Sequence, residues 1–271
     1  MADAVASLKD TSDVPRLEAQ VLAAYAFGKS RSWISTHDDI PLTAKKRKFL
    51  DKLLLRLIAE EPLPYITGMQ EFFGYPFRVN PNVLIPRPET EQLVEITLQW
   101  LAAHPHCRTG IDIGTGSGCI AISLCRQIKD LHITAVDISA TTLEIARQNA
   151  QLNEVCHQLT FELANLLPES VPKIDFLCAN LPYIPSSELD TLKVAQHEPV
   201  GALDGGENGF TLIEELLIHL QYNPPAFMIF EMDISHAKLA TSFCEGVYPH
   251  SRINIVQDLA GHDRYLIIET V

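Results

Sequence analysis

Apolar residues recur at helical spacing from Val14 to about Glu60. They form two runs, with members three to four positions apart: Leu17, Val21, Leu22, Tyr25 in the first and Phe49, Leu53, Leu54, Leu57, Ile58 in the second. This period gives each segment one apolar face, so we expect two or more amphipathic helices in this region.

Glycine and proline gather between Pro62 and Pro76 and mark a change of local structure. Apolar residues then alternate with polar ones as in half-buried strands, at Phe77, Val79, Val83 and Ile85. We therefore expect a small helical domain over residues 1–74, followed by a β-hairpin linker over residues 75–88.

The pattern changes again after Pro88, where short apolar strands alternate with amphipathic helices. The strands are expected at residues 110–113, 133–136, 159–163, 174–179, 226–231, 252–258 and 264–269. The helices are expected at 89–103, 117–128, 140–152, 210–221 and 236–243. Such alternation predicts an α/β domain over residues 89–271, with a seven-stranded, mostly parallel sheet covered by helices on both faces. Ligands of such sheets bind at the carboxyl ends of the strands, where the strand order reverses.

Composition narrows the choice of partners and compartment. The 271 residues carry a net charge of −13 and their basic residues are scattered, whereas strong nucleic-acid binding needs a contiguous positive surface. Direct nucleic-acid binding is therefore disfavoured. The chain has neither a basic-then-apolar leader nor an apolar run of about 18 residues, so we expect a cytoplasmic protein without a membrane partner.

The cysteines and histidines do not predict a metal site. The six cysteines lack the paired spacing of a zinc site or a disulfide framework, which favours small buried hydrophobes in a reducing compartment. His104, His106 and Cys107 lie close together, but they have no second ligand pair and flank Pro105. A surface loop is the better interpretation of this cluster.

A glycine-rich turn joins a predicted strand to a predicted helix. The candidate cofactor loop consists of Gly114, Thr115, Gly116, Ser117 and Gly118. Glycine is needed where the backbone turns tightly or approaches a ligand, and a helix N-terminus attracts an anion. A dinucleotide-binding enzyme is the competing interpretation, but Cys119 takes the place of the last glycine of the GxGxxG fingerprint.

Two further segments fit a nucleoside ligand. Asp137 ends the next predicted strand, where its carboxylate would accept hydrogen bonds from both ribose hydroxyls; the alternative is an N-cap of the following helix. Asn165 and Leu166 follow the third strand, where the first would bind the adenine amine and the second pack on the ring. Asn165 could equally shape a turn.

The fourth strand of the predicted sheet delivers Asn180, Leu181, Pro182 and Tyr183 to the carboxyl edge, beside the cofactor loop. The Asn180 amide oxygen and the Leu181 carbonyl would each accept one N–H of an acceptor –NH2 group. Pro182 fixes the backbone, and Tyr183 offers a flat face for a planar group. Two acceptors orient the lone pair of a conjugated nitrogen for attack, so this segment predicts a catalytic site for a planar amine.

These motifs, with others along nearly the whole chain, resemble the HemK/PrmC-like release factor glutamine methyltransferases. The shared segments are Pro64–Gly68, Glu71–Phe73, Val83–Glu91, Gly114–Gly118, Asp137, Asn180–Tyr183, Glu198–Pro199, Ala202–Leu203 and Gly206–Gly209. The run from Leu84 to Glu91 is the most specific, because general methyltransferases lack it.

The resemblance implies a Rossmann-like class I methyltransferase fold and the cofactor S-adenosylmethionine, with S-adenosylhomocysteine as product. It implies methylation of the glutamine amide nitrogen (N5) in the Gly-Gly-Gln motif of class I peptide chain release factors, in translation termination. The N-terminal helical domain would dock the release factor; alternatively, it only stabilises the catalytic domain. The implied cofactor-binding residues are the glycine loop, Asp137, Asn165, Leu166 and Asn180.

Two positions depart from the family pattern. Leu181 stands where the family has proline, and Asn165 where it usually has aspartate. The string Asn-Leu-Pro-Tyr is more typical of ribosomal RNA adenine dimethyltransferases, so an RNA adenine N6-methyltransferase is the main alternative. In those enzymes the catalytic domain comes first, whereas here about 85 residues precede the cofactor-binding domain. A catalytically inactive binding module with the same fold is the third possibility.

Overall fold

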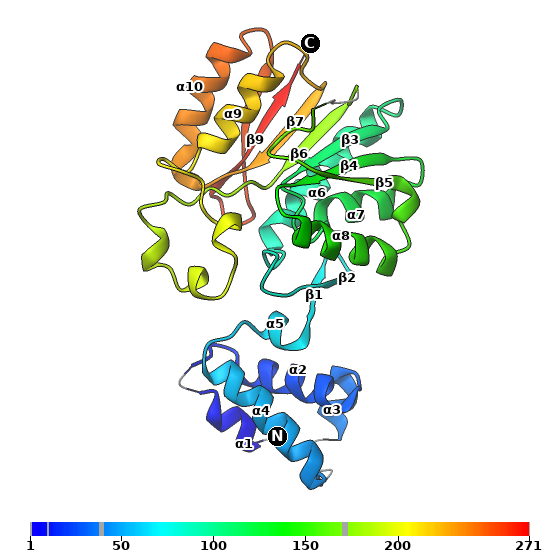
Figure 1. The fold of residues 1–271 in the computed structure, drawn as a ribbon, viewed down its shortest axis with the longest axis vertical. Coiled ribbons are helices and arrows are strands. Elements are labelled where there is room, and N and C mark those ends of the chain that lie inside the picture. The colour runs from blue at the N-terminus through cyan, green and yellow to red at the C-terminus, as the bar shows by residue number, and fades with distance from the viewer. Residues whose placement is uncertain (1, 10, 38–40, 170–172, 271) are drawn as a thin grey trace. The chain divides into compact units, whose positions relative to one another are not determined.

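The computed structural model describes residues 2–9, 11–37, 41–169 and 173–270 (Figure 1). The chain forms two compact units, Met1–Met69 and Gln70–Val271. No described helix is both long enough and apolar enough to cross a lipid bilayer.

The first unit is built from helices around a small apolar core. Its helices are α1 (Ala2–Ser7), α2 (Pro15–Phe27), α3 (Arg31–Thr36), α4 (Ala44–Ile58) and α5 (Leu63–Thr67). Leu22, Leu53 and Leu57 bury the predicted apolar faces of α2 and α4 in this core. The helical character predicted for this region is confirmed. Tyr25 and Phe49 are 47% and 42% exposed, and their rings lie 6.4 Å apart on the surface of the unit.

A seven-stranded sheet forms the centre of the second unit, as the alternating pattern predicts. Its strands are β3 (Thr109–Ile113), β4 (His132–Asp137), β5 (Leu159–Leu163), β6 (Phe176–Ala179), β7 (Phe227–Glu231), β8 (Arg252–Gln257) and β9 (Asp263–Glu269). The order is β5-β4-β3-β6-β7-β9-β8, and among these described strands β9 alone runs opposite to the other six. The chain moves outward from β3 in one direction and from β6 in the other. The strand order therefore reverses between β3 and β6, which is where ligands bind in such sheets.

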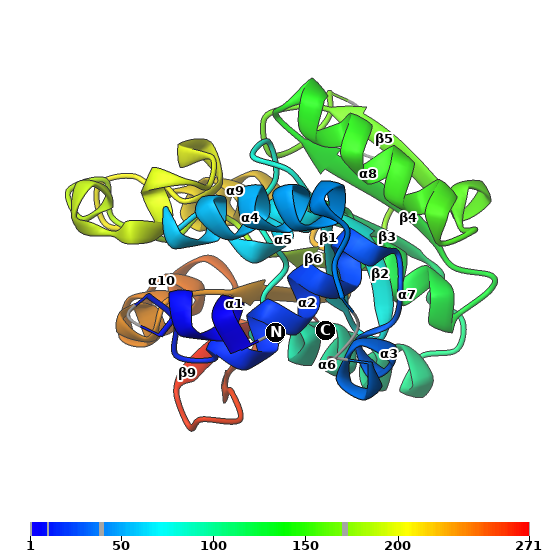
Figure 2. The same cartoon turned by 90° about the horizontal axis from the view of Figure 1, so that it is seen from below.

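Helices cover both faces of this sheet (Figures 1 and 2). One face carries α6 (Pro88–Ala103), α7 (Cys119–Gln127) and α8 (Ala140–Leu152), and the other carries α9 (Thr211–Leu220) and α10 (Ala237–Val247). Successive strand residues point to opposite faces, so Phe176 and Cys178 enter the first core and Leu177 and Ala179 the second. This double burial explains the continuous apolar runs of β6 and β7.

The β-hairpin lies earlier than the expected range of 75–88. Its strands are β1 (Met69–Phe72) and β2 (Tyr75–Arg78), and residues 79–87 form no strand. Val79, Val83 and Ile85 are buried, as their alternation predicts. However, side chains rather than a second strand bond this segment: the Ile85 N–H donates to Glu198 Oε2 at 3.1 Å, and the Thr142 hydroxyl donates to the Asn82 carbonyl at 2.9 Å.

Candidate active site

A cavity of about 430 Å³ opens at the carboxyl ends of β3, β4, β5 and β6, the point where the strand order reverses. The loops after these strands line it, together with the segment Pro81 to Thr90 that leads into α6. Its size is in the range of small-molecule sites, roughly 300 to 1,000 Å³. The cavity therefore combines the chemistry-bearing loops of the sheet with the most family-specific segment of the chain.

The glycine loop forms the floor of this cavity, and hydrogen bonds within the protein fix its backbone conformation. Gly114, Gly116 and Gly118 have φ angles of 69°, 56° and 81°, a region that glycine adopts without strain. The Gly116 N–H donates to Asp137 Oδ2 at 3.0 Å, and the Gly118 N–H donates to the Thr115 carbonyl at 2.8 Å. The loop thus keeps its shape through bonds made inside the protein.

The start of α7 follows this loop directly. Ser117, Cys119 and Ile120 line the cavity there, where the helix presents the positive end of its dipole. Because the N–H groups of Thr115, Gly116 and Gly118 are already bonded within the protein, the first turn of α7 is the better place for the carboxylate of an amino-acid tail.

Asp137 lines the cavity from the end of β4. Its carboxylate accepts hydrogen bonds from the backbone N–H groups of Gly116 and Ser139, at 3.0 and 2.9 Å. Burial raises the pKa of Asp137 above its ordinary value, and these bonds oppose the rise. The N-cap alternative is wrong, because the Ser139 side chain caps α8 by accepting the Thr142 N–H. Each carboxylate oxygen has a second lone pair, so Asp137 retains the capacity to accept ribose hydroxyls.

Asn165 and Leu166 line the same cavity after β5. Leu166 is buried, although its φ of 61° places it in the left-handed region that leucine rarely adopts. Ile138, which is 68% exposed, also lines the cavity. These apolar side chains and the amide of Asn165 suit a flat, polar-edged ring such as adenine.

A second cavity of about 240 Å³ shares Asn180, Leu181 and Pro182 with the first. Tyr183 lines the second cavity but not the first. Burial raises the pKa of Tyr183 above the ordinary value for tyrosine. The Leu181 side chain is buried, and its Cδ2 lies 3.0 Å from the place where a Cβ on Gly114 would stand. The segment Asn180–Tyr183 therefore lies at the junction between the glycine loop and a second binding space.

The segment after β6 is closely packed against residues 203–209. The Ile184 N–H donates to the Leu203 carbonyl at 3.0 Å, and the Ser186 hydroxyl donates to Asp204 at 2.6 Å. A Cβ added to Gly209 would stand 2.3 Å from the Tyr183 carbonyl oxygen, so only glycine fits there. This close approach explains the glycine at position 209 in the family segment Gly206–Gly209.

Three buried acidic groups belong to this region, and the sequence alone assigned none of them a role, although Glu198 stands in one of the family segments. Asp112 accepts the Thr115 hydroxyl at 2.6 Å, Glu231 accepts the Thr90 hydroxyl at 2.8 Å, and Glu198 pairs with Arg87. Burial raises the pKa values of Asp112 and Glu231 to about 7. Asp112 and Glu231 each stand at an otherwise apolar strand, and that lone charge was the signal available in the sequence.

All the predicted site residues except Gly118 line one or both cavities, and Gly118 completes the loop. His104, His106 and Cys107 lie in the turn after α6, where the His104 ring stacks on Trp100 at 4.2 Å. No group of three or more metal-binding side chains is found among the described residues.

Comparisons with known proteins agree with this architecture. The family model of the PrmC N-terminal domain matches residues 1–68, and that of the methyltransferase small domain matches residues 90–197. The N-terminal domain of human METTL16 in complex with SAH has a similar fold, with a TM-score of 0.55 at 16% identity over 97% of this chain and 96% of that chain. The hMettl16 catalytic domain in complex with the MAT2A 3'UTR hairpin 6 has a TM-score of 0.58 at 17% identity, over 77% and 80% of the two chains. At these identities the likeness shows the fold alone.

The fold and the pocket at the switch point define a Rossmann-like methyltransferase. The release factor glutamine methyltransferase of Koribacter versatilis (strain Ellin345) is 36% identical over 257 residues, which cover 93% of this chain and 90% of the relative. That of Staphylococcus aureus (strain NCTC 8325 / PS 47) is 34% identical over 92% of this chain and 90% of the relative. This chain belongs to the release factor glutamine methyltransferase family, so the resemblance noted in the sequence is confirmed.

Proposed function

We propose that this protein transfers a methyl group from S-adenosylmethionine to the side-chain amide nitrogen of a glutamine in a peptide chain release factor. The finer proposal is that this glutamine belongs to the Gly-Gly-Gln motif of class I release factors. The observation that carries the proposal is the position of Asn180–Tyr183, which line a second cavity that adjoins the glycine-loop cavity.

The first cavity suits S-adenosylmethionine in shape and in donor set. Asp137, Asn165 and Leu166 line this cavity. Asp137 would accept the ribose hydroxyls, and Asn165 and Leu166 would contact the adenine. The glycine loop and the start of α7 would hold the amino-acid tail. When bound, the cofactor supplies an electrophilic methyl group on a sulfonium sulfur.

Asn180 and Leu181 prepare the acceptor nitrogen for reaction. The lone pair of an amide nitrogen is delocalised into the carbonyl, so the nitrogen is a weak nucleophile. The Asn180 Oδ1 and the Leu181 carbonyl accept its two N–H groups and orient the lone pair towards the cofactor cavity. No strong base is needed, because a methylated amide nitrogen is acidic and loses its proton to water.

Leu181 retains the function of the usual proline because the acceptor contact uses its backbone carbonyl. Since Pro182 follows, Leu181 is confined to extended conformations. The same two acceptors would also bind an adenine amine, so an RNA substrate is the alternative outcome of the test. The order of the units favours the release factor: the helical unit precedes the methyltransferase unit and matches the PrmC N-terminal domain.

The N-terminal unit is proposed as the docking element for the release factor. Contacts remote from the acceptor glutamine would offset the cost of ordering a flexible loop in the active site. The exposed aromatic pair Tyr25 and Phe49 is a candidate contact, since aromatic side chains are enriched at protein interfaces.

Transfer of a radioactive methyl group to purified release factors and, in parallel, to ribosomal RNA tests the proposal. We expect label in the release factor, loss of labelling when the acceptor glutamine is replaced by alanine, and one added methyl on that side chain by mass spectrometry. Label in RNA adenines with none in release factors would overturn the proposal. Failure to bind S-adenosylmethionine would instead favour an inactive binding module.

A further inference from the structure

We propose that Thr90 and Glu231 are positioning residues that fix which way the amide of Asn180 points. This inference rests on the proposed role of Asn180 in the acceptor site. It goes beyond that role by assigning the groups that keep the amide oxygen, rather than the amide nitrogen, available to the acceptor.

A chain of two hydrogen bonds connects the three side chains. The Asn180 Nδ2 donates to the Thr90 Oγ1 at 3.0 Å, and the Thr90 hydroxyl donates to the Glu231 Oε2 at 2.8 Å. Thr90 is 2% exposed and Glu231 1% exposed, so the bond between them is shielded from water, whereas Asn180 is half-buried at the wall of the cavity. The three residues come from the loop after β6, the first turn of α6 and the end of β7.

The charge on Glu231 sets the direction of this chain. An ionised carboxylate only accepts hydrogen bonds, so the single proton of the Thr90 hydroxyl is committed to Glu231. Thr90 can then offer Asn180 only an oxygen lone pair, to which only the amide –NH2 can donate. The Asn180 Oδ1 is therefore left for the acceptor, which needs an oxygen to receive its N–H.

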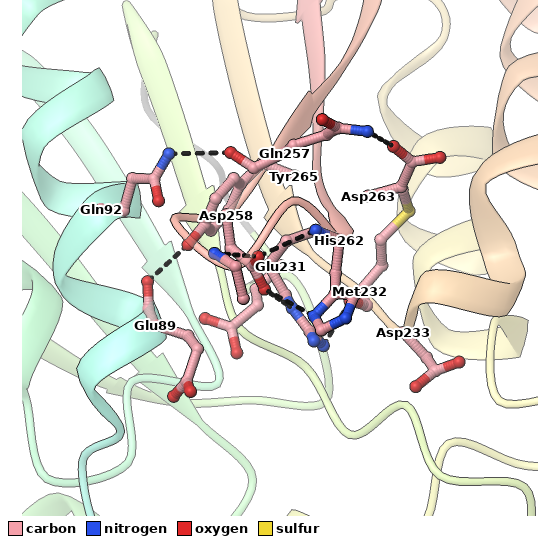
Figure 3. A network of polar contacts seen from close by, with 12 residues as sticks. Glu89, Gln92, Glu231, Met232, Asp233, Gln257, Asp258, His262, Asp263 and Tyr265 are labelled. Atoms are coloured by element: carbon pink, nitrogen blue, oxygen red, sulfur yellow. Dashed lines mark hydrogen bonds and ion pairs between the residues drawn. The ribbon is translucent and has the colours of Figure 1, made fainter.

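The surroundings of Glu231 support the view that its charge controls the direction of these hydrogen bonds (Figure 3). Figure 3 shows Glu231 at the end of β7 and Glu89 on α6, whose charge acts on Glu231. Burial is the main cause and raises the pKa of Glu231 to about 7, whereas hydrogen bonds with Thr90 and Asn180 and the charge of Arg264 oppose the rise. The titratable or charged side chains that interact electrostatically with Glu231 are Glu89 of α6, Cys119 of α7, Tyr183 of the loop after β6, and Arg264 and Tyr265 of β9.

Protonation of Glu231 removes the preference of the two hydrogen bonds for this one direction. A protonated carboxyl can donate to the Thr90 oxygen, which frees the Thr90 hydroxyl to donate to the Asn180 Oδ1. The amide then has a competing orientation in which its –NH2 group faces the acceptor –NH2 group. We therefore expect the rate of methyl transfer, measured at saturating S-adenosylmethionine, to decrease as the pH falls and Glu231 becomes protonated.

The first test is single-turnover methyl transfer by Thr90→Val and Glu231→Gln at saturating S-adenosylmethionine and release factor. Each variant should lower the rate at least about fivefold, because it loses one of the hydrogen bonds that orient the Asn180 amide. Thr90→Ser keeps the hydroxyl and should restore the rate to within about twofold of the wild type. The matched control is Thr97→Val on the same helix: Thr97 is equally buried, but its hydroxyl bonds the Leu93 carbonyl.

The pH profile separates positioning from simple structural damage. The rate of the wild type should decrease as the pH is lowered below about 7. The rate of Glu231→Gln should not change with pH in this range. Wild-type rates for Thr90→Val, or an unchanged acid limb in Glu231→Gln, would overturn the inference. If Thr90→Val does not fold, Glu231→Gln alone decides.

A readout without turnover examines the amide itself. The side-chain –NH2 resonances of Asn180, assigned by their loss in Asn180→Asp, should exchange slowly with solvent in the wild type and in Thr97→Val. They should exchange at least about fivefold faster in Thr90→Val, and equal exchange would overturn the inference. A wild-type methylation rate in Asn180→Ala would instead refute the proposed acceptor role, and a slow Asn180→Ala with a normal Thr90→Val would refute only the positioning role.

Discussion

The guanidinium of Arg87 is paired with the carboxylate of Glu198, 111 residues further along the chain. The Glu198 side chain is only 4% exposed, and its second oxygen accepts the Ile85 N–H. One carboxylate thus holds two points of the family-specific segment before α6. Because Leu84 and Arg87 line both cavities, this pair also fixes the wall that the two cavities share.

Replacing Glu198 should therefore cost both stability and activity. Glu198→Ala leaves the Ile85 N–H and the Arg87 guanidinium without their acceptor, and we expect a loss of about 2 to 4 kcal/mol in the free energy of unfolding. Urea denaturation measures this loss. The control Glu245→Ala removes an exposed glutamate of α10 and should change stability by less than about 0.5 kcal/mol. Equal midpoints for the two variants would contradict the structural role of the pair.

Asp137→Ala should weaken S-adenosylmethionine binding by at least about 1.5 kcal/mol, because it removes charge-assisted hydrogen bonds to the ribose. The change also leaves the Gly116 N–H without its acceptor and loosens the glycine loop. Calorimetric titration measures the effect, with Glu162→Ala on the neighbouring strand β5 as an exposed control. Unchanged affinity in a folded Asp137→Ala protein would rule out the ribose assignment.

Asn180→Ala should act on the rate rather than on cofactor affinity. The loss of one preorganised acceptor group predicts a decrease of roughly 10²-fold in single-turnover methyl transfer. Affinity for S-adenosylhomocysteine, measured by calorimetry, should stay close to that of the wild type. The exposed Asn223→Ala serves as the control for a generic loss of an amide side chain. If Asn180→Ala transfers methyl groups at the wild-type rate, the amide has no part in the reaction.

The parts of the site that could be predicted from the sequence are those carried by short segments at strand ends. The glycine loop, Asp137 and Asn180 each follow a strand, and parallel strands bring their carboxyl ends to one edge of the sheet. Their proximity therefore followed from the pattern of elements alone.

Partners supplied by distant packing could not be predicted in this way. Thr90 and Glu231 are 141 residues apart in the sequence, and neither residue belongs to a local motif that implies the other. The expected position of the hairpin was wrong for the same reason. Alternating apolar residues report burial, whereas the hydrogen-bond partner of Ile85 is the side chain of Glu198 rather than a neighbouring strand.

The stability of the unliganded protein should fall as the pH rises from about 5 to about 7. Burial raises the pKa values of Asp112 and Glu231 to about 7, whereas in the unfolded chain these groups titrate near their ordinary values, close to pH 4. In this window the folded protein binds protons that the unfolded chain releases, so the free energy of unfolding decreases with rising pH. Each group contributes a slope of up to about 1.4 kcal/mol per pH unit.

Asp112→Asn should remove one of these two contributions and flatten the pH dependence, measured by urea denaturation at several pH values. The control Glu215→Gln changes an exposed carboxylate of α9 and should leave the slope as in the wild type. A slope that is unaffected by Asp112→Asn would mean that Asp112 is ionised throughout this range in the folded protein.

Leu181→Pro restores the family's usual residue and tests how the acceptor is bound. If Leu181 contributes only its carbonyl, the variant should methylate glutamine within about tenfold of the wild-type rate, a change of roughly 1.4 kcal/mol in the barrier. The buried Leu181 side chain also packs near Gly114, so part of any change could reach the cofactor loop. Measuring affinity for S-adenosylhomocysteine in the same variant separates that effect from acceptor binding. A loss of much more than tenfold with normal cofactor affinity would show that the Leu181 side chain itself shapes the acceptor site, and that this protein recognises its substrate differently from relatives with proline.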